Sequence, residues 1–494
     1  MIDDQPPLYI KFCIYASYLI LAIFGLIRDV LRFFEIEKHR KSDERELKQG
    51  YVPLLSGLTA FYYRNIYQRC REMFGIPITS IPNSHVELMN FENDSFNRCI
   101  RFPGTTQKCL NLVSYNYLGF SENQGPRLQK VAETIKKCGS STGAVRNELG
   151  TLDYHIKLEK MVAKYLGVED SIIFGMGFAT NSLNISAIIG QGSLIISDQY
   201  NHASLALGCK LSNASIKVFK HNDTIDLEQK IVEALADGQP GTHEKWKKII
   251  IVLEGLYSME GTLVDLPEVM RLKKKYKTYL YVDEAHSIGA IGKTGRGVCD
   301  HFGIDPREVD ILMGTFTKSF GSAGGYLAGK KSLINYIRVN SHSFAYASSM
   351  AAPIAQQILS VLEVIMTKEG QMRISTLQEN SRYFRKRLRQ LGFIVYGDNT
   401  SPVVPLLIFL PGLLKNFVKE ARILGLGCIP VGYPATDFTG LRLRFCISAC
   451  HTREMLDQAI RIIDHLGDKM SFKFALRNQW FSNSIEKIEK IFIQ

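Results

Sequence analysis

The sequence predicts an α/β protein built around a largely parallel β-sheet, and two patterns indicate this fold. Between about residues 126 and 350, short apolar runs alternate with helical patterns, which is typical of a parallel sheet covered on both faces. After about residue 356, two long helical stretches surround segments with strand character, which fits a smaller α+β domain. The 494 residues exceed what one compact core holds, so we expect two or three domains.

Strands and helices alternate along the predicted large domain. Strands are expected at 171–174, 193–197, 249–253, 279–282, 309–313 and 326–328, and helices at 153–165, 225–236 and 266–276. In the smaller domain, strand character falls at 403–409 and 441–447. The expected division is an anchor and charged connector at 1–50, an N-terminal segment at 51–125, a large domain at 126–355 and a small domain at 356–494.

Composition excludes some classes of function. The apolar fraction of 46% is that of a folded globular protein, so disorder does not account for the bulk of the chain. The formal charge of +12 suits a phosphate-rich substrate or an anionic membrane, while the lack of an arginine-rich tract with interleaved aromatic residues disfavours nucleic acid. The ten cysteines are scattered without zinc spacing, so we expect no metal site and a reduced, cytosol-facing body.

The N-terminus carries a candidate membrane anchor. Residues 12–27 form an uncharged run of sixteen residues, preceded by Lys11 and followed by basic residues from Arg28 onward. The acidic start does not resemble a secretory signal, and basic flanks stay on the cytoplasmic side. We therefore expect an anchoring helix with the body in the cytosol. The run is short for a full span, so a spanning helix, an interfacial helix and a buried helix remain open.

One lysine and one acid suggest the chemistry. Lys318 lies among hydroxyl residues and glycines in the run 314–321, just after a predicted strand. Asp283 lies thirty-five positions upstream, at the end of another predicted strand. A pyridoxal phosphate (PLP) site needs this pair, because the lysine binds the aldehyde as a Schiff base and the acid keeps the pyridine nitrogen protonated.

Further candidates also follow predicted strands, at whose carboxyl ends the ligands of open parallel sheets bind. Ser258 and His286 come after two strands, and the glycine turn around Gly177 opens a helix that could hold a phosphate. Arg442 and Arg444 lie in a predicted strand, and we expect them to point to opposite faces, one to bind a substrate carboxylate and the other to be solvated.

Several motifs together resemble a known family. Asp-Glu-Ala-His-Ser at 283–287, Gly-Thr-Phe-Thr-Lys-Ser-Phe-Gly at 314–321 and Ser-Asp-Gln-Tyr-Asn-His-Ala-Ser at 197–204 resemble the α-oxoamine synthases. These are fold-type I PLP enzymes that condense an amino acid with an acyl-CoA thioester. The segments 50–54, 61–67, 401–406 and 432–436 are similar to the branch that makes long-chain bases. The resemblance covers residues 50 to about 465.

The resemblance implies roles for individual residues. Lys318 would bind the cofactor and remove the substrate α-proton, Asp283 would bind the pyridine nitrogen, and His202 would stack on the ring and orient the substrate carboxylate. The other implied cofactor contacts are His286 and Ser258 near the phenolic oxygen, Gly177, Phe178 and Thr315 at the phosphate, and Ser348 and Ser349 across a dimer interface. Arg444 matches the arginine that binds the carboxylate.

The resemblance also implies an activity and partners. The implied reaction is the decarboxylating condensation of L-serine with palmitoyl-CoA to 3-oxosphinganine. The implied partner is a homologous subunit that lacks the lysine and forms a heterodimer with this chain. The implied location is the endoplasmic reticulum membrane. Two alternatives stay open. One is another α-oxoamine synthase that uses glycine or alanine, and the other is a catalytically silent scaffold subunit.

Overall fold

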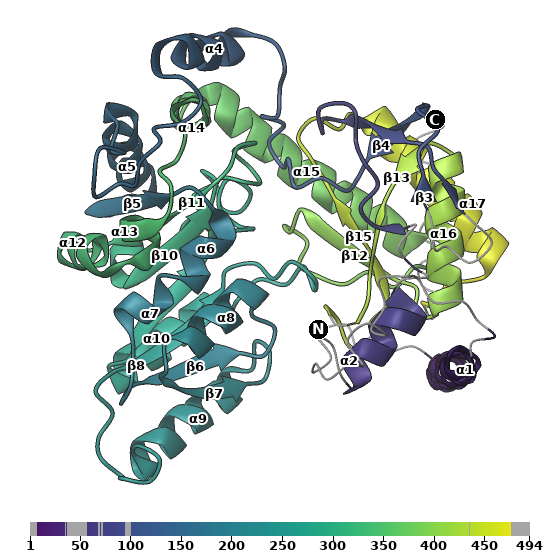
Figure 1. Cartoon of the computed structure of the whole chain (residues 1–494), viewed down its shortest axis with the longest axis horizontal. Helices are drawn as coiled ribbons and strands as arrows, with labels where there is room; N and C mark the ends of the chain where they lie inside the picture. The colour runs from purple at the N-terminus through teal and green to yellow at the C-terminus, as the bar shows by residue number, and fades with distance from the viewer. Residues whose placement is uncertain are drawn as a thin grey trace, which may run out of the picture.

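The computed structural model describes residues 7–34, 36, 57–67, 70, 73–93, 100–433 and 435–475. The connector at 37–50, the motif at 50–54 and Pro434 of the motif at 432–436 lie outside the described residues. Figure 1 shows two lobes, one around a large sheet and one around the C-terminal strands, with the long helix α15 (Lys368–Gln390) running from one to the other. The proposed domain boundaries remain predictions.

The first lobe is built on a seven-stranded sheet in the order β5-β11-β10-β9-β8-β6-β7. Within this sheet β11 alone runs antiparallel to its two neighbours, and the remaining pairs are parallel. The predicted largely parallel sheet is confirmed. The strands are β5 (Asp170–Phe174), β6 (Leu194–Asp198), β7 (Ser215–Phe219), β8 (Ile249–Glu254), β9 (Tyr279–Asp283), β10 (Ile311–Thr315) and β11 (Gly325–Gly329).

Helices cover both faces of this sheet because alternate strand residues point to opposite sides. In β8, Ile251 and Leu253 belong to one buried cluster and Ile250 and Val252 to another. The first cluster includes residues of α5 (Asp153–Leu166), α9 (Thr224–Asp237), α10 (Leu266–Tyr276) and α14 (Ala352–Ile365). The second includes residues of α7 (Ile185–Ile188), α8 (Ala203–Leu211), α12 (Lys331–Asn340) and α13 (His342–Tyr346).

The bounds of one expected strand were wrong, and one strand was not predicted. The strand expected at 309–313 begins at Ile311 and ends at Thr315, because Val309 still closes the 3-10 turn Pro306–Glu308. The edge strand β7 was not predicted. It is only partly buried, and Lys217 interrupts its apolar run, so it lacks the continuous apolar character of the inner strands.

The second lobe combines the C-terminal part with the segment before the large sheet. β12 (Val403–Leu407), β15 (Arg442–Cys446) and β14 (Ile429–Val431) form one sheet. β1 (His85–Met89) and β4 (Thr106–Asn111) form another with β13 (Leu426–Gly427). The helices α16 (Pro411–Ile423) and α17 (Arg453–Met470) pack against each other beside these sheets.

The N-terminal helix α1 (Leu8–Phe33) lies against this second lobe. The most apolar 18-residue window within Leu8–Arg32 has a mean hydropathy of 2.1, and only 17% of that window is buried, so by length and composition this helix could cross a membrane. On one side, Ile10 and Ile14 are buried against a small cluster of the second lobe. Near its end, Asp29 pairs with Arg64 at 3.0 Å. The other sides of the helix expose large apolar side chains.

His451 connects distant segments of the second lobe. Its Nδ1 accepts a hydrogen bond from the Ser448 backbone N–H at 3.1 Å, and its Nε2 lies 3.0 Å from the Asn111 carbonyl oxygen. The first contact makes Nδ1 an acceptor, so Nε2 carries the proton and donates it. Burial lowers the pKa of His451 to about 4.

This histidine predicts a pH-dependent loss of stability. Unfolded histidine has its ordinary pKa near 6.5, so the unfolded state binds a proton that the folded state excludes, and stability falls as the pH drops from about 6.5 to about 4. The predicted loss is roughly 3 kcal/mol. The thermal unfolding midpoint measured across this range should fall less steeply with pH in His451→Gln than in the unaltered chain. The exposed His301→Gln should leave the slope unchanged, and an equal slope in both variants would contradict the assignment.

Candidate active site

Two acids end neighbouring strands at one edge of the large sheet. Glu254 of β8 and Asp283 of β9 are paired in register, and both are buried. β10 continues the same edge, since Met313 is the register partner of Asp283, and Thr315 ends that strand. Lys318 follows three residues later. The structure therefore brings the predicted lysine and acid to one end of the sheet, where parallel strands of this kind place their ligands.

Lys318 is partly buried and sits in a strongly charged environment. Desolvation lowers the pKa of its amine to about 8, opposed by the nearby carboxyl groups of Asp283 and Glu254 and assisted by the Arg444 guanidinium. In the part of the chain that the structure describes, Lys318 forms no ion pair. A lysine held in this way has a larger neutral fraction than a solvated one, which suits it to covalent chemistry.

Asp283 is held by hydrogen bonds to neutral donors. Its Oδ2 accepts from Asn181 Nδ2 at 2.7 Å, and its Oδ1 accepts from the Ala285 backbone N–H at 2.8 Å. No cation among the described residues forms an ion pair with it. A buried carboxylate without a cation is a suitable partner for a protonated ring nitrogen.

Tyr115 connects the cationic and imidazole groups of the site. Its ring centroid lies 5.7 Å from Lys318 Nζ and 4.8 Å from the Arg444 guanidinium. The His286 ring is 5.3 Å away, and His286 Nδ1 lies 2.9 Å from the buried Tyr117 hydroxyl. Burial holds the pKa of His286 well below its usual range. Neither tyrosine was predicted from the sequence, because the preceding strand β4 contains Gln107 and Lys108 and is not an apolar run of the kind that marked the other strand ends.

The two arginines of β15 do not point to opposite faces, and that expectation was wrong. Residues two apart in a strand share a face. Accordingly, Arg442 Nη1 donates to the Met259 carbonyl at 2.9 Å, and Arg444 Nη1 lies 3.6 Å from the sulfur of the same residue. The expected solvation of the second arginine was also wrong, because both side chains are buried.

Within the described part of the chain, only one of these arginines has an acidic partner. Arg442 pairs with Glu260 at 3.4 Å and also donates to the Gly440 carbonyl at 2.7 Å. Arg444 forms no ion pair with any described residue, and its buried Nε has no hydrogen-bond partner there. A buried guanidinium without an anion is a candidate site for a ligand carboxylate.

His202 is positioned from two sides at the start of α8. Its backbone N–H donates to Glu254 Oε1 at 2.5 Å, and its Nδ1 lies 2.7 Å from Ser204 Oγ. The ring remains exposed and meets the Phe178 ring edge-on at 6.0 Å. Burial raises the pKa of Glu254 well above its usual range, with nearby Asp283 adding to the effect. Glu254 was not predicted as a site residue, because its place beside Asp283 depends on the order of the strands in the sheet.

A glycine turn lies beside the end of β10. The helix α6 (Gly177–Ser182) begins at Gly177, where a Cβ atom would meet Thr315 Oγ1 at 2.6 Å. The absence of a side chain leaves the backbone accessible beside the Thr315 hydroxyl, as a phosphate cradle requires. Gly177, Phe178 and Thr315 are thus brought together.

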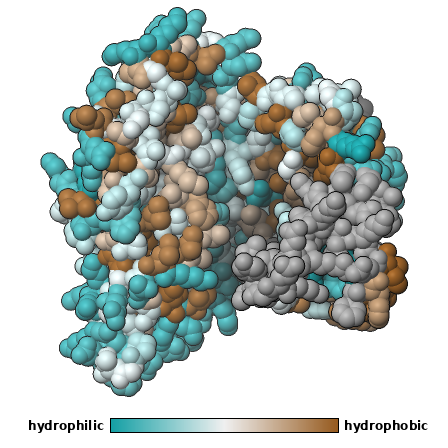
Figure 2. Space-filling model, in the orientation of Figure 1, coloured by the Kyte–Doolittle hydropathy of each residue, from teal (hydrophilic) through white to brown (hydrophobic). Residues whose placement is uncertain are grey.

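The remaining predicted residues lie around this group. Ser258 is buried in the turn after β8. Ser348 is exposed and pairs with Val145, while Ser349 Oγ donates to the Ala144 carbonyl at 2.7 Å. Figure 2 shows that this face of the molecule is hollowed between the two lobes.

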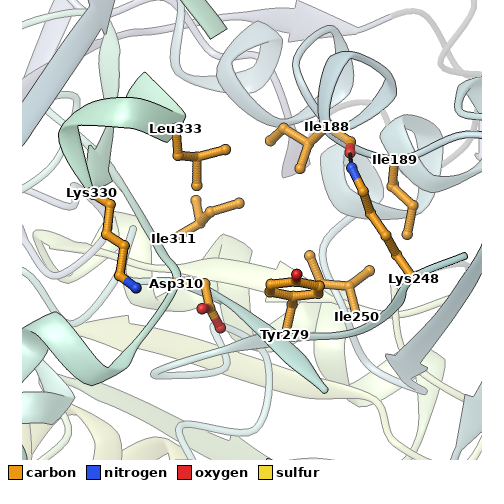
Figure 3. Close-up of a pocket in the computed structure, with 9 residues that line it drawn as sticks. All are labelled: Ile188, Ile189, Lys248, Ile250, Tyr279, Asp310, Ile311, Lys330 and Leu333. Atoms are coloured by element: carbon orange, nitrogen blue, oxygen red, sulfur yellow. Dashed lines mark hydrogen bonds between the residues drawn. The ribbon is translucent and has the colours of Figure 1, made fainter. Parts of the chain in front are cut away.

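A separate cavity lies at the opposite end of the large sheet. It has a volume of about 230 Å³, and Figure 3 shows it lined by isoleucines and by Tyr279, Asp310 and Lys330. Lys248 at its rim already donates to the Ile188 carbonyl at 2.9 Å. Tyr279 and Ile311 begin their strands, so this cavity is distant from the strand ends that carry Asp283 and Thr315.

The residues at the carboxyl edge fit PLP. Among the described residues they supply an amine without an ion pair, a carboxylate without a cation and a glycine turn beside a hydroxyl, which match the aldehyde, the ring nitrogen and the phosphate. No group of three or more His, Cys, Asp or Glu side chains in the described residues could hold a metal ion.

Sequence comparison relates this chain to known enzymes. A family model described as aminotransferase class I and II matches residues 107–463. Serine palmitoyltransferase 3 of Homo sapiens is 48% identical over 96% of this chain and 86% of its own length. Serine palmitoyltransferase 2 of Dictyostelium discoideum is 46% identical over 96% of both chains, and that of Saccharomyces cerevisiae is 43% identical over 95% of this chain and 84% of its own.

Solved structures that superpose on this chain include serine palmitoyltransferases. A Sphingomonas wittichii serine palmitoyltransferase superposes with a TM-score of 0.74 at 25% identity and covers 84% of this chain and 99% of its own. A serine palmitoyltransferase variant of S. paucimobilis with PLP and myriocin bound has the same TM-score and identity and covers 84% of this chain and 100% of its own. The chain therefore belongs to the aminotransferase class I and II family of PLP-dependent enzymes, and within that family to the serine palmitoyltransferases.

Proposed function

We propose that this protein is a serine C-palmitoyltransferase that condenses L-serine with palmitoyl-CoA to give 3-oxosphinganine, CoA and CO₂. The observation that carries the proposal is that two cationic groups, the partly buried Lys318 amine and the buried Arg444 guanidinium, lie at one site without an ion-pair partner among the described residues. Identity to serine palmitoyltransferases over nearly the whole chain supports the choice of substrates.

Residues at the carboxyl edge of the sheet are proposed to hold the cofactor. When bound, PLP supplies an aldehyde that reacts with amines and a ring that accepts electron density from the substrate α-carbon. Lys318 would hold the aldehyde carbon and Asp283 the ring nitrogen, while His286 and Ser258 would lie near the phenolic oxygen. The phosphate contacts within this chain would come from the Gly177 and Phe178 backbone amides and the Thr315 hydroxyl, while Ser348 and Ser349 would contact a phosphate across the subunit interface.

The other polar groups would orient the substrate. Arg444 would bind the serine carboxylate, because its guanidinium is buried without an acidic partner. His202 would stack on the cofactor ring and donate to the same carboxylate. Lys318 Nζ would take the α-proton, since a pKa of about 8 lets it accept and return a proton near neutral pH.

A homologous subunit that lacks the lysine is the proposed partner. Large apolar side chains are exposed around the glycine turn and the Ser348 segment, namely Leu149 at 92%, Met176 at 60% and Tyr346 at 78%. Apolar side chains gathered beside a site favour a protein interface there. Ser348, which is itself exposed, would then reach a phosphate across this interface.

The helix α1 is proposed to anchor the protein in the endoplasmic reticulum membrane with the body in the cytosol. Its exposed sides are apolar, and basic residues such as Arg28 and Arg32 follow the apolar run. Membrane attachment suits an enzyme whose product carries a long alkyl chain.

The activity is tested by substrate selection. The full-length chain, purified with the candidate partner subunit, is given L-serine, glycine or L-alanine with palmitoyl-CoA or succinyl-CoA, and products are scored by mass. We expect 3-oxosphinganine from L-serine and palmitoyl-CoA, and no product from Lys318→Ala, whereas the exposed Lys293→Ala should retain activity. A preference for glycine with succinyl-CoA would refute the substrate assignment. Full activity in Lys318→Ala would refute the catalytic role.

The carboxylate site is tested by comparing the two arginines. Arg444→Ala should raise the dissociation constant for L-serine roughly 10- to 100-fold, because a charge-assisted contact is lost, and should bind L-serine and L-serinamide equally. Arg442→Ala is the matched control, since it removes a neighbouring arginine that already forms an ion pair with Glu260. This control should keep the discrimination between serine and serinamide. Loss of discrimination in Arg442→Ala alone would reverse the assignment.

The membrane role is tested on the exposed side of α1. Phe12, Leu19 and Ile23 are exposed, and replacing all three with lysine should move the protein from the membrane fraction to the supernatant, since each lysine costs about 2.5–3.5 kcal/mol at the centre of a bilayer. Lysine at the equally exposed Ile225 and Val232 of α9 is the control and should change nothing. Retention of the triple variant in washed membranes would show that another surface binds the lipid.

A further inference from the structure

The side chains around Asp283 form one connected hydrogen-bond chain. Its central member is Asn181 of α6, which is 1% exposed. Asn181 Nδ2 donates to Asp283 Oδ2 at 2.7 Å and to Ser204 Oγ at 3.0 Å. Its Oδ1 accepts from the Tyr281 hydroxyl at 2.7 Å. One buried amide therefore joins the strand that carries Asp283 to the helix that carries Ser204.

The direction of each hydrogen bond follows from the groups involved. An ionised carboxylate only accepts, so the NH₂ group of Asn181 faces Asp283 and its oxygen faces Tyr281. The same NH₂ group supplies the hydrogen bond to Ser204 Oγ. The Ser204 hydroxyl then has its own hydrogen to donate to His202 Nδ1, 2.7 Å away.

A second donor reaches the same nitrogen. The Ser204 backbone N–H points to His202 Nδ1 at 3.2 Å. Nδ1 is thus an acceptor for two donors from Ser204, and a neutral ring with this arrangement carries its hydrogen on Nε2.

The ring is neutral for electrostatic reasons. Desolvation lowers the pKa of His202, and the Lys318 amine lowers it further, while Asp283 opposes both. Glu254 accepts the His202 backbone N–H from the other side. Around neutral pH the imidazole is therefore without charge, and its tautomer decides what it offers to a ligand.

We propose that Asn181 and Ser204 are positioning residues that hold the Asp283 carboxylate in place and fix His202 as the Nε2–H tautomer. The exposed edge of the ring then presents a hydrogen-bond donor, whereas the other tautomer would present a lone pair that repels a carboxylate. The benefit to serine binding rests on the proposed function. The tautomer itself does not.

A simple helix cap explains only part of this arrangement. His202 is the N-cap residue of α8, and its side chain accepts from the Ser204 backbone N–H. That cap needs neither the Ser204 hydroxyl nor Asn181. Ser204→Ala removes the hydroxyl and keeps the cap, so it separates the two explanations.

The tautomer is measured directly in the full-length apoprotein. With ¹⁵N-labelled histidine, the two ring nitrogens of His202 are identified by their absence in His202→Asn. We expect a protonated Nε2 and an unprotonated Nδ1 in the unaltered protein, and a mixture of tautomers in Ser204→Ala and Asn181→Leu. A protonated Nδ1 in the unaltered protein would overturn the proposal, and so would an unchanged tautomer in both variants.

Ligand binding supplies a second measurement. Ser204→Ala should raise the dissociation constant for L-serine about fivefold to tenfold while PLP affinity stays within about twofold, because one hydrogen bond to His202 is lost. Ser204→Thr restores the hydroxyl and should return serine binding to within about twofold of the unaltered protein. Asn181→Leu should weaken both ligands, since it also removes a donor from Asp283.

The two proposals can fail separately. If Ser204→Ala binds L-serine as tightly as the unaltered protein does, the positioning role is refuted. If the unaltered protein does not bind L-serine at all, the substrate assignment fails, while the nitrogen signals of His202 still decide the tautomer.

Discussion

The site depends on holding charged groups away from water without giving each one a partner of opposite charge. Asp283 accepts hydrogen bonds from N–H donors, and Arg444 lies beside the Met259 sulfur and the Tyr115 ring, but neither forms an ion pair among the described residues. Such groups are costly to bury, and a ligand with complementary charges offsets that cost when it binds. Arg442 shows the opposite case, because Glu260 already satisfies it and leaves it nothing to offer a ligand.

The arrangement of the strands turns these scattered residues into one site. Parallel neighbours end at the same edge, so Glu254, Asp283 and Thr315 are close although they are far apart in sequence. The second lobe then adds Arg444 from β15, and the segment after β4 adds Tyr115. The site therefore requires both lobes.

Local patterns were enough to predict much of this molecule. The inner strands are continuous apolar runs, and α10 begins at a capping aspartate and buries one side, so their positions were visible in the sequence. Lys318 and Asp283 stood out because each follows such a strand. The edge strand β7 escaped because it is half exposed and contains Lys217. Glu254 was not predicted because an acid at the end of a strand points to a site only when the adjacent strand, here the one that carries Asp283, is known.

Periodicity and strand-end motifs are properties of consecutive residues, so the chemical groups and the elements that carry them could be predicted from the chain. Which of these groups meet depends on three-dimensional packing. The ion pair that distinguishes Arg442 from Arg444 is formed with Glu260, which comes from a different part of the chain. The place of Asn181 between Asp283 and Ser204 likewise depends on packing α6 against β9 and α8. Hydrogen bonds and charge pairs act over a few ångströms in space, and no distance along the chain reveals them.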